Sequence, residues 1–287
     1  MISHHTHHHA SIDSLLFFKP YVIILSILVL RANVCIAQET NQERYEKCKN
    51  NFVCGNRIDV GYPFWGVDHN DGDKSRPDYC GLPSYKLDCY DGDIAEIKIG
   101  EETYRVLEIN SSSQAMNITN KEFLDDDDAC PAKYSIANFG SPLFNDAPDV
   151  VPLFLYFDCL SFNPPDQFTY RFKCNTGTRD AYFWFTEAPP IPDFTPDFRS
   201  CGKIVQVHVM KEALEGLTAK PETLPIVIKQ GFNVTYIYTE SGSSIDICPT
   251  CSGSGGACGY NTTTSNPTCF CPDGTTGISC GMFFSSS

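Results

Sequence analysis

Residues 48–89 read Cys48-x5-Cys54-Gly55, then Ile58, then Gly61-Tyr62-Pro63-Phe64-Trp65-Gly66, then Arg76-Pro77-Asp78-Tyr79-Cys80-Gly81-Leu82-Pro83, and finally Tyr85-Lys86-Leu87-Asp88-Cys89. Four cysteines and six aromatic residues lie within this stretch. A segment this short buries too little surface to fold on a hydrophobic core alone, so disulfides must stabilise it. The stretch has more aromatic rings than the interior of so small a module needs. The stretch therefore predicts a disulfide-stapled module that presents side chains to a ligand.

An apolar run at 21–30 lies between Lys19 and Arg31. About ten residues are too few to cross a bilayer, which takes ~20 residues of helix. The run is followed by Cys35-Ile36-Ala37, which offers small residues where a signal peptidase cleaves. We therefore expect residues 1–37 to be a signal peptide, with an uncleaved signal anchor as the alternative.

The cysteine count agrees with this cleavage. Removal of the leader takes Cys35 from the fifteen cysteines of the chain. The fourteen that remain are Cys48, Cys54, Cys80, Cys89, Cys130, Cys159, Cys174, Cys201, Cys248, Cys251, Cys258, Cys269, Cys271 and Cys280. An even number in a secreted chain predicts seven disulfides, but the spacing leaves their pairing open.

The formal net charge of the full chain is −14, and the predicted mature chain is one unit more negative. This sign excludes nucleic acid as a partner, because phosphate groups attract basic surfaces. No later segment approaches twenty apolar residues. We expect a secreted protein of the extracellular space or cell wall, or the outer part of a longer receptor at the plasma membrane.

The pattern beyond Cys89 is that of β-structure. Alternating apolar residues on both sides of Gly100 predict a hairpin over 94–109. Runs rich in β-branched and aromatic residues follow at 151–159, 168–174, 181–185, 204–209 and 225–228. The one helical candidate is short, around 211–217. The predicted fold is all-β and disulfide-rich, with two cystine-stapled β modules.

The last forty residues form a second cysteine framework, Cys248-x2-Cys251-x6-Cys258-x10-Cys269-x-Cys271-x8-Cys280. The end of this framework has the spacing of the closing half of an EGF-like module. Two close cysteine pairs are also compatible with zinc, but secretion and even parity favour disulfides. We expect a small, metal-free EGF-like segment.

Four Asn-x-Ser/Thr sequences predict N-linked glycans on Asn110, Asn117, Asn233 and Asn261. Four consecutive aspartates at 125–128 could coordinate calcium, although such a run is more typical of a solvated loop. The loop 68–73 resembles a calcium loop but has Gly72 where an oxygen ligand is needed. No cofactor is predicted.

Catalytic motifs do not stand out. The predicted mature chain has two histidines, His69 and His208, without a nucleophile motif beside them. The Gly-rich run 252–256 lies between cysteines rather than between a strand and a helix, so it does not predict a phosphate site. A carboxylate pair for glycoside cleavage stays open. We expect a protein that is not an enzyme.

The cysteine spacing resembles a known family. Cys54-Gly55, Ile58, Tyr62-Pro63-Phe64 and the pattern Cys80-Gly81-x-Pro83-x-Tyr85-x-Leu87-x-Cys89 resemble the galacturonan-binding module of plant wall-associated receptor kinases. The runs 61–66 and 76–79 look closest to the leaf-rust-resistance receptor-like kinase branch. Cys201, Gly231-Phe232 and the framework from Cys248 resemble the C-terminal module of those ectodomains.

The resemblance implies three parts after the leader: a galacturonan-binding-like module at 38–125, a β-rich part at 126–247 and an EGF-like end at 248–287. The chain departs from the family pattern at Tyr85, where Phe is usual, and at Tyr236, where Trp is frequent. No membrane span or kinase domain follows, so we expect an ectodomain without its kinase.

The implied ligand is pectic polysaccharide or an oligogalacturonide. Exposed aromatic rings pack against the C–H face of a sugar, and basic side chains bind its carboxylates. The candidates are Tyr62, Trp65, Arg76, Tyr79, Tyr85 and Lys86, with Arg57 and Lys74 as further cations. Residues 38–125 hold ten Lys or Arg against seventeen Asp or Glu. Binding of a polyanion therefore needs a local basic cluster or a calcium bridge.

Two alternatives remain at this point. A secreted interaction or decoy module would bind a peptide or a receptor ectodomain through strand edges and the EGF-like end. A secreted hydrolase would release reducing ends from pectin. A deletion of 248–287 is expected to separate sugar binding, which would survive, from protein binding.

Overall fold

The structure is a computed structural model. It describes residues 39–54, 58–90, 94–124, 128–131, 141–160, 162–164, 170–175, 180–185, 197–237 and 246–281. The predicted signal peptide and Arg57 lie outside the described residues. Residues 41–287 form one compact unit. None of the described helices has the length and apolar character needed to span a bilayer.

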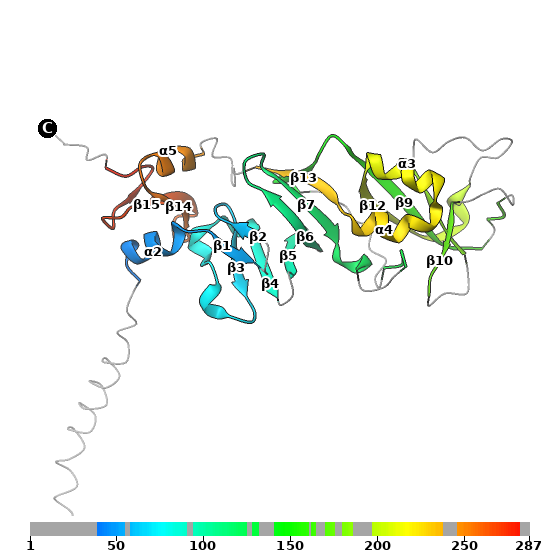
Figure 1. The fold of residues 1–287 in the computed structure, drawn as a ribbon, viewed down its shortest axis with the longest axis horizontal. Helices are drawn as coiled ribbons and strands as arrows, with labels where there is room; N and C mark the ends of the chain where they lie inside the picture. Colours follow the sequence, from blue (N-terminus) through cyan, green and yellow to red (C-terminus); the bar gives the residue numbers. More distant parts are fainter. Residues whose placement is uncertain are drawn as a thin grey trace, which may run out of the picture. The chain divides into compact units, whose positions relative to one another are not determined.

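The larger sheet has seven strands in the order β3-β4-β5-β6-β7-β13-β8 (Figure 1). Its strands are β3 Trp65–Asp68, β4 Lys86–Tyr90, β5 Ile94–Ile99, β6 Glu102–Asn110, β7 Ala115–Asn120, β8 Phe144–Asp146 and β13 Phe232–Tyr236. The pair β3 and β4 is parallel, and the other neighbours are antiparallel. The predicted hairpin is confirmed as β5 and β6, which meet at Gly100 with φ +62°.

Two strands of this sheet come from beyond the predicted first module. β13 pairs with β7 and with β8, and Phe144, Phe232 and Val234 share one buried core with Ile118. The division at 125/126 expected from the resemblance is therefore not a division between sheets. The chain leaves the seven-stranded sheet after β8 and returns to it at β13.

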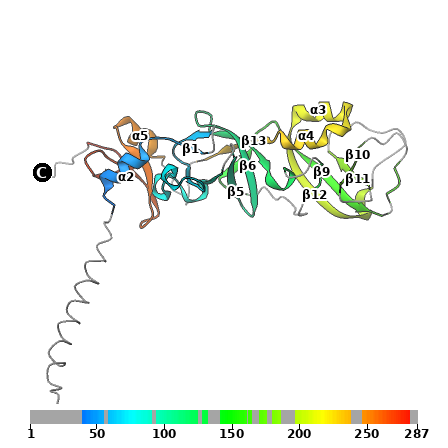
Figure 2. The same cartoon turned by 60° about the horizontal axis from the view of Figure 1, so that its bottom comes forward.

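The intervening chain forms a second sheet in the order β10-β11-β9-β12 (Figure 2). Its strands are β9 Val150–Cys159, β10 Arg171–Lys173, β11 Asp180–Trp184 and β12 Cys201–Met210. Two helices, α3 Lys211–Ala219 and α4 Leu224–Lys229, pack on it and contribute buried leucine, valine and isoleucine side chains to its core. Both lobes are built mainly of strands, as predicted.

The helices confirm one prediction from the sequence and contradict another. The predicted helix around 211–217 is confirmed as α3. The predicted strand 225–228 is wrong, because these residues belong to α4. Pro225 occupies the first turn of that helix, where its missing N–H costs nothing, and buried Leu224, Val227 and Ile228 have helical spacing.

The two ends of the described chain hold the smaller elements. They are α2 Asn41–Cys48, β1 Phe52–Cys54, β2 Ile58–Val60, α5 Cys248–Gly253, β14 Ala257–Asn261, β15 Asn266–Phe270 and β16 Thr276–Gly277. Ala257 and Phe270 of the C-terminal segment share a buried cluster with Cys48 and Cys80. The C-terminal segment therefore packs directly on the first module.

Disulfides join all fourteen cysteines of the predicted mature chain. The pairs are Cys48–Cys80, Cys54–Cys89, Cys130–Cys174, Cys159–Cys201, Cys248–Cys258, Cys251–Cys269 and Cys271–Cys280. The first two pairs close the stretch 48–89 on itself. In the C-terminal segment, the first cysteine pairs with the third, the second with the fourth and the fifth with the sixth.

Arg76 lies inside the stretch 48–89 and is 3% exposed. Its guanidinium donates hydrogen bonds to the backbone carbonyls of Phe64 at 3.1 Å, Cys48 at 3.0 Å and Cys80 at 3.2 Å, and also to that of Asn50. Burial lowers the pKa of Arg76 to about 10, so the group stays charged at neutral pH. Arg76 was expected to bind a ligand carboxylate; the structure corrects this, because its donors already hold four chain segments together.

His208 of β12 faces Asp146 of β8 and so connects the two sheets. Its Nε2 lies 3.4 Å from the Asp146 carboxylate, and its side chain is 8% exposed. Burial lowers the pKa of His208 below its ordinary value, and the nearby Asp146 carboxylate only partly offsets this. Burial also raises the pKa of Asp146. His208 is therefore favoured in its neutral form in the folded protein.

We expect Arg76→Lys to lower the free energy of unfolding by at least about 2 kcal/mol. A lysine ammonium cannot reproduce the planar fork, and a buried carbonyl left without a donor costs about 1–3 kcal/mol. Urea unfolding under non-reducing conditions measures the change. Lys74→Gln is the matched control, because the Lys74–Asp71 ion pair is exposed and contributes about 0–1 kcal/mol. Equal stability of the two variants would contradict the structural role of Arg76.

We expect stability to fall as the pH drops from 7 to 5. The folded-state pKa of His208 lies below its unfolded value, so the unfolded chain binds more protons in this range. The stabilisation is complete above the ordinary histidine pKa of about 6.5 and is lost below it. His208→Gln should flatten the pH dependence of the urea midpoint. An unchanged pH dependence in His208→Gln would contradict this role of the histidine.

Candidate functional site

Trp65 is the predicted ligand-binding ring that the structure holds in an accessible position. It begins β3 and is half-buried, and its indole Nε1–H donates to the Leu82 carbonyl at 2.9 Å. The Lys86 ammonium lies 6.0 Å from the ring centroid. The hydrogen bond fixes the orientation of the indole, while part of the ring stays open to a ligand.

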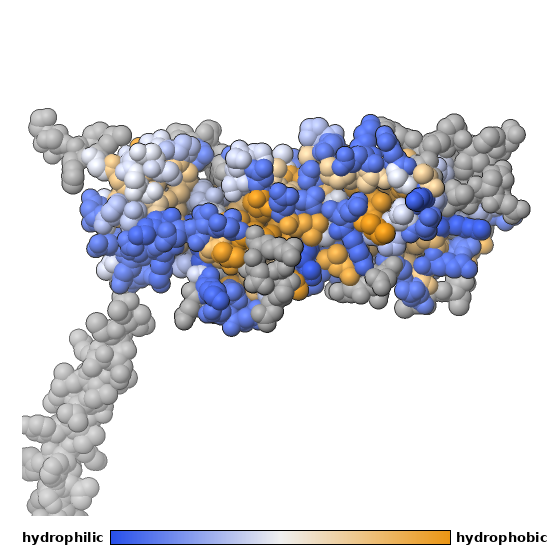
Figure 3. All heavy atoms as spheres, in the orientation of Figure 1, coloured by the Kyte–Doolittle hydropathy of each residue, from blue (hydrophilic) through white to orange (hydrophobic). Residues whose placement is uncertain are grey.

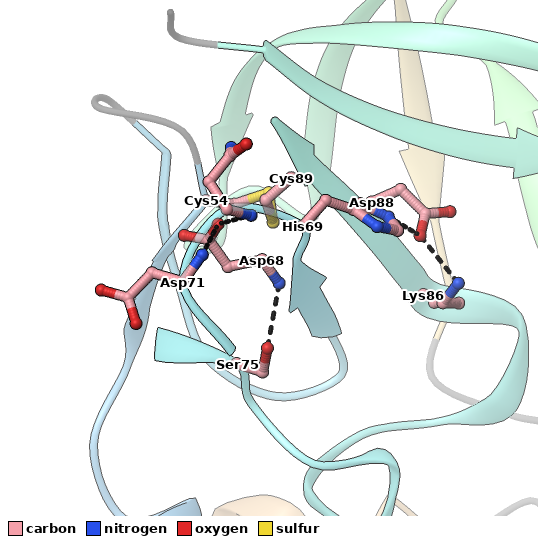
Figure 4. The surroundings of a disulfide bond; sticks show 9 residues. Cys54, Asp68, His69, Asp71, Ser75, Lys86, Asp88 and Cys89 are labelled. Atoms are coloured by element: carbon pink, nitrogen blue, oxygen red, sulfur yellow. Dashed lines mark hydrogen bonds and ion pairs between the residues drawn. A yellow bond between two sulfur atoms is a disulfide. The ribbon is translucent and has the colours of Figure 1, made fainter. Parts of the chain in front are cut away.

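Lys86 belongs to a network on the same face of the sheet (Figure 4). The Asp88 carboxylate accepts from the Lys86 ammonium at 2.7 Å and lies 3.0 Å from His69 Nε2. Burial raises the pKa of Asp88, but the hydrogen bonds from Lys86 and His69 outweigh it and hold that pKa below its usual value. His69 also stacks on Tyr90, with ring centroids 4.6 Å apart. The positive charge of Lys86 is thus compensated by the Asp88 carboxylate, and the Lys86 side chain is 41% exposed.

A groove of about 880 Å³ opens beside Trp65. We call it the Trp65 groove. Its polar and aromatic lining includes Lys47, Asn50, Asn51, Trp65, Lys74 and Asp78. The Lys74 ammonium forms an ion pair with Asp71 at 3.0 Å, with side-chain exposures of 69% and 43%. Such an exposed pair is weak, so the Lys74 ammonium is available to a ligand anion.

A second hollow, of about 490 Å³, lies around Tyr62. We call it the Tyr62 cleft. Its lining includes Lys49, Asn51, Tyr62, Gln114, Asp246 and Ser252. Tyr62 is half-buried and packs against the core of the first module. Trp65 and Tyr62 therefore line two different hollows.

Two predicted rings have other roles. Tyr85 is fully buried, with Phe64, Phe144 and Tyr236 around its ring at centroid distances of 5.5, 5.2 and 6.0 Å. Its hydroxyl donates to the Ile237 carbonyl. The expectation that Tyr85 contacts a ligand is corrected, because its aromatic neighbours cover the ring. Tyr236, the other departure from the family pattern, belongs to the same core.

Tyr79 is half-buried where the stretch 48–89 meets the C-terminal segment. Its ring meets Phe270 of β15 edge-on at 6.0 Å, and the Arg44 guanidinium lies 5.0 Å from its centroid. These contacts attach the C-terminal segment to the stretch 48–89. Tyr79 does not line the Trp65 groove or the Tyr62 cleft.

The four predicted glycan acceptors fall into two settings. Asn110 and Asn261 begin turns, where their side-chain oxygens accept from the backbone N–H groups of Ser113, Thr263 and Thr264. Asn117 and Asn233 lie opposite each other on β7 and β13, and Asn117 Nδ2 donates to Asn233 Oδ1 at 3.0 Å.

The acidic loops are internally hydrogen-bonded where the structure describes them. Asp68 accepts from the N–H groups of Asn70 and Asp71, and these bonds lower its pKa (Figure 4). Asp128 accepts from the N–H groups of Cys130 and Asn175; residues 125–127 lie outside the described part. The described residues contain one group of three candidate metal ligands, Cys269, Cys271 and Cys280, and disulfides engage all three sulfurs.

The sequence reasoning missed Lys47, Asn50 and Asn51 of the Trp65 groove. These polar residues flank Cys48 at the end of α2, and no spacing pattern distinguishes them from ordinary surface residues. Their position in the wall of the groove depends on Arg76, which donates hydrogen bonds to the Cys48 and Asn50 carbonyls and so fixes this segment.

Two parts of the chain match known protein families. Residues 48–120 match the model of the wall-associated receptor kinase galacturonan-binding family, and residues 173–274 match that of the wall-associated receptor kinase C-terminal family. No solved structure gives a significant match.

Curated relatives come from Arabidopsis thaliana. The chain is 30% identical over 254 residues to leaf rust 10 disease-resistance locus receptor-like protein kinase-like 2.8, covering 84% of this chain and 26% of the relative. It is 27% identical over 268 residues to the 2.1 member of the same series, covering 91% of this chain and 39% of that relative. The chain thus spans between a quarter and two-fifths of the length of these relatives. By these matches the chain carries the galacturonan-binding and C-terminal modules of the wall-associated receptor kinase families, and it is similar to leaf-rust-type receptor-like kinases over the part that it spans.

Proposed function

We propose that this chain is an extracellular, non-catalytic module that binds pectic galacturonides of the plant cell wall through the Trp65 groove. The observation that carries the proposal is the groove itself, whose lining residues other than Lys47 lie within the segment matched by the galacturonan-binding family. The matching families are receptor modules rather than enzymes. Seven disulfides agree with an oxidising, extracellular compartment.

The chemistry of the groove suits an acidic sugar. A pyranose C–H face packs against the electron-rich face of an indole, and Trp65 supplies that ring in a fixed orientation. Lys47 and Lys74 supply ammonium groups for the carboxylates, and the side-chain amides of Asn50 and Asn51 suit hydroxyl groups. These groups offer a ring for the sugar face and cations for its carboxylates, beside the apolar side chains of Phe52, Val53, Val67 and Pro77 and the carboxylate of Asp78.

Net charge is the main opposing effect. The predicted first module is acidic, so it repels a polyanion at long range. That repulsion decays over a Debye length of about 8 Å at physiological ionic strength, whereas the lysines of the groove would act in direct contact. Calcium held between protein and pectate carboxylates is a further route to the same ligand.

A second candidate function, binding of a peptide or receptor ectodomain, has one observation in its favour. Tyr90, Ile94 and Leu107 occupy neighbouring positions on β4, β5 and β6, and Tyr90 and Leu107 are 36% and 43% exposed. Apolar side chains also gather on the surface around β5, β6 and β13 (Figure 3). An exposed apolar row of this kind is typical of protein-binding surfaces.

Deletion of 248–287 does not separate the two candidates cleanly. Phe270 and Ala257 share a buried cluster with Cys48 and Cys80, so the deletion would expose the core of the first module. Point variants on each surface are the better test. Leu107→Ser alters the apolar row and lies outside the Trp65 groove.

We expect Trp65→Ala to weaken binding of oligogalacturonides about tenfold or more, which corresponds to ~1.4 kcal/mol. The variant removes the ring on which the sugar packs. Trp65→Phe keeps an aromatic face and should retain most of the affinity, although it loses the bond to Leu82. Isothermal titration calorimetry measures both, and thermal unfolding checks that each variant is folded. Unchanged affinity in Trp65→Ala would remove the groove from the proposal, and Leu107→Ser should leave sugar binding intact.

We also expect affinity for oligogalacturonides to depend steeply on salt or on calcium. Ion pairs with Lys47 and Lys74 weaken as salt rises, whereas a calcium bridge is lost when a chelator is added. Titrations at low and high salt, with and without chelator, distinguish the two routes. An affinity that is insensitive to both would contradict both electrostatic routes.

A further inference from the structure

The two hollows share a wall. Asn51 and Arg76 line both the Trp65 groove and the Tyr62 cleft. Arg76 is buried and holds the Asn50 carbonyl, so it fixes the segment that carries Asn51. Gly61 leaves room for Asn51, since a β-carbon at position 61 would lie 2.3 Å from Asn51 Oδ1. The exposed Asn51 side chain therefore lies on the edge that the two hollows share.

The Tyr62 cleft is assembled from distant parts of the chain. Tyr62 and Lys49 come from the first module, Gln114 from the turn between β6 and β7, and Asp246 and Ser252 from the C-terminal segment. Gln114 has φ +51°, a left-handed conformation that is uncommon for a residue other than glycine. Its carbonyl accepts from the Tyr236 N–H at 2.9 Å, which fixes this backbone at the cleft.

The cleft is less basic than the groove. Its one lysine, Lys49, forms an exposed ion pair with Glu46 at 2.5 Å, and Asp246 adds an exposed carboxylate. The groove has two lysines, Lys47 and Lys74, beside the exposed Asp78 carboxylate. The guanidinium of Arg76 lines both hollows and is bound to backbone carbonyls, so it does not distinguish them. The side-chain amides of Asn51 and Gln114, the Ser252 hydroxyl and the Tyr62 ring suit uncharged sugar hydroxyls and C–H faces.

We propose that the Tyr62 cleft is a second carbohydrate subsite, for uncharged sugar units, which continues the Trp65 groove across Asn51. The two hollows together would select a chain with acidic units at one end and uncharged units at the other. Methyl-esterified galacturonate and neutral hexose share this uncharged chemistry. The inference extends the proposed galacturonide binding and adds the C-terminal segment to the recognition surface.

The test uses Ser252→Trp in the full chain, which fills the cleft from an exposed position of α5. Thr250→Trp is the matched control, because Thr250 is also exposed on α5 but does not line the cleft. Gln114→Gly is a second variant: it removes the amide at a left-handed position that glycine adopts without strain, so the fold should be kept.

Calorimetry would compare four probes: short acidic oligogalacturonides, long acidic ones, long methyl-esterified ones and neutral galactan oligomers. The wild-type protein should bind the long esterified probe at least fivefold more tightly than the short acidic probe. Ser252→Trp and Gln114→Gly should lose this gain and keep the affinity for the short acidic probe. Thr250→Trp should behave as wild type. Binding of galactan in place of the esterified probe would identify neutral hexose as the occupant.

Failure of the inference and failure of the proposed function give different results. If acidic probes bind but Ser252→Trp leaves the gain from long or esterified probes unchanged, the cleft is not a subsite and the groove proposal stands. If acidic probes do not bind at all, while an uncharged probe binds and is lost in Ser252→Trp, the cleft is a sugar site without the groove. If no uncharged or esterified probe gains over the short acidic one in the wild-type protein, the inference is overturned.

Discussion

The guanidinium of Arg76 is the contact on which the rest of the first module depends. It binds the carbonyls of Cys48 at the end of α2, of Asn50 after it, of Phe64 just before β3, and of Cys80. It therefore joins segments that the Cys48–Cys80 disulfide also brings together. Disulfides limit how far the stretch 48–89 can expand, but they do not set the course of the backbone between them. The arginine does so, and both hollows are lined by residues of the segment that it fixes.

Features set by local pattern could be predicted from the sequence. Spacing or alternation predicted the even cysteine count, the hairpin about Gly100, a short helix around 211–217 and the strand-rich character. Trp65 was singled out, with Tyr62, Tyr79 and Tyr85, among the aromatic rings of a short cystine-rich stretch, and the structure leaves it half-buried beside a groove. The family resemblance covered nearly the same residues as the matching family models.

Features set by distant contacts could not be predicted in this way. Tyr85 is buried because β8 and β13 bring Phe144 and Tyr236 against it, and no pattern near position 85 reports those strands. Nothing in the sequence around Arg76 distinguishes a buried arginine bound to carbonyls from an exposed one. The run 225–228 has the β-branched content of a strand, but the spacing of its buried side chains and Pro225 at its start favour a helix on the second sheet.

The position of β13 between β7 and β8 has a consequence for the order in which the protein can assemble. The seven-stranded sheet includes β13, residues 232–236. The pairing of β13 with β7 therefore cannot form until more than a hundred residues beyond β7 have been synthesised. During synthesis the second lobe is complete before β13 emerges, and until then β7 exposes an unpaired edge. An unpaired strand edge can pair with another chain, and the first lobe is finished only when the inserted lobe has returned the chain to it.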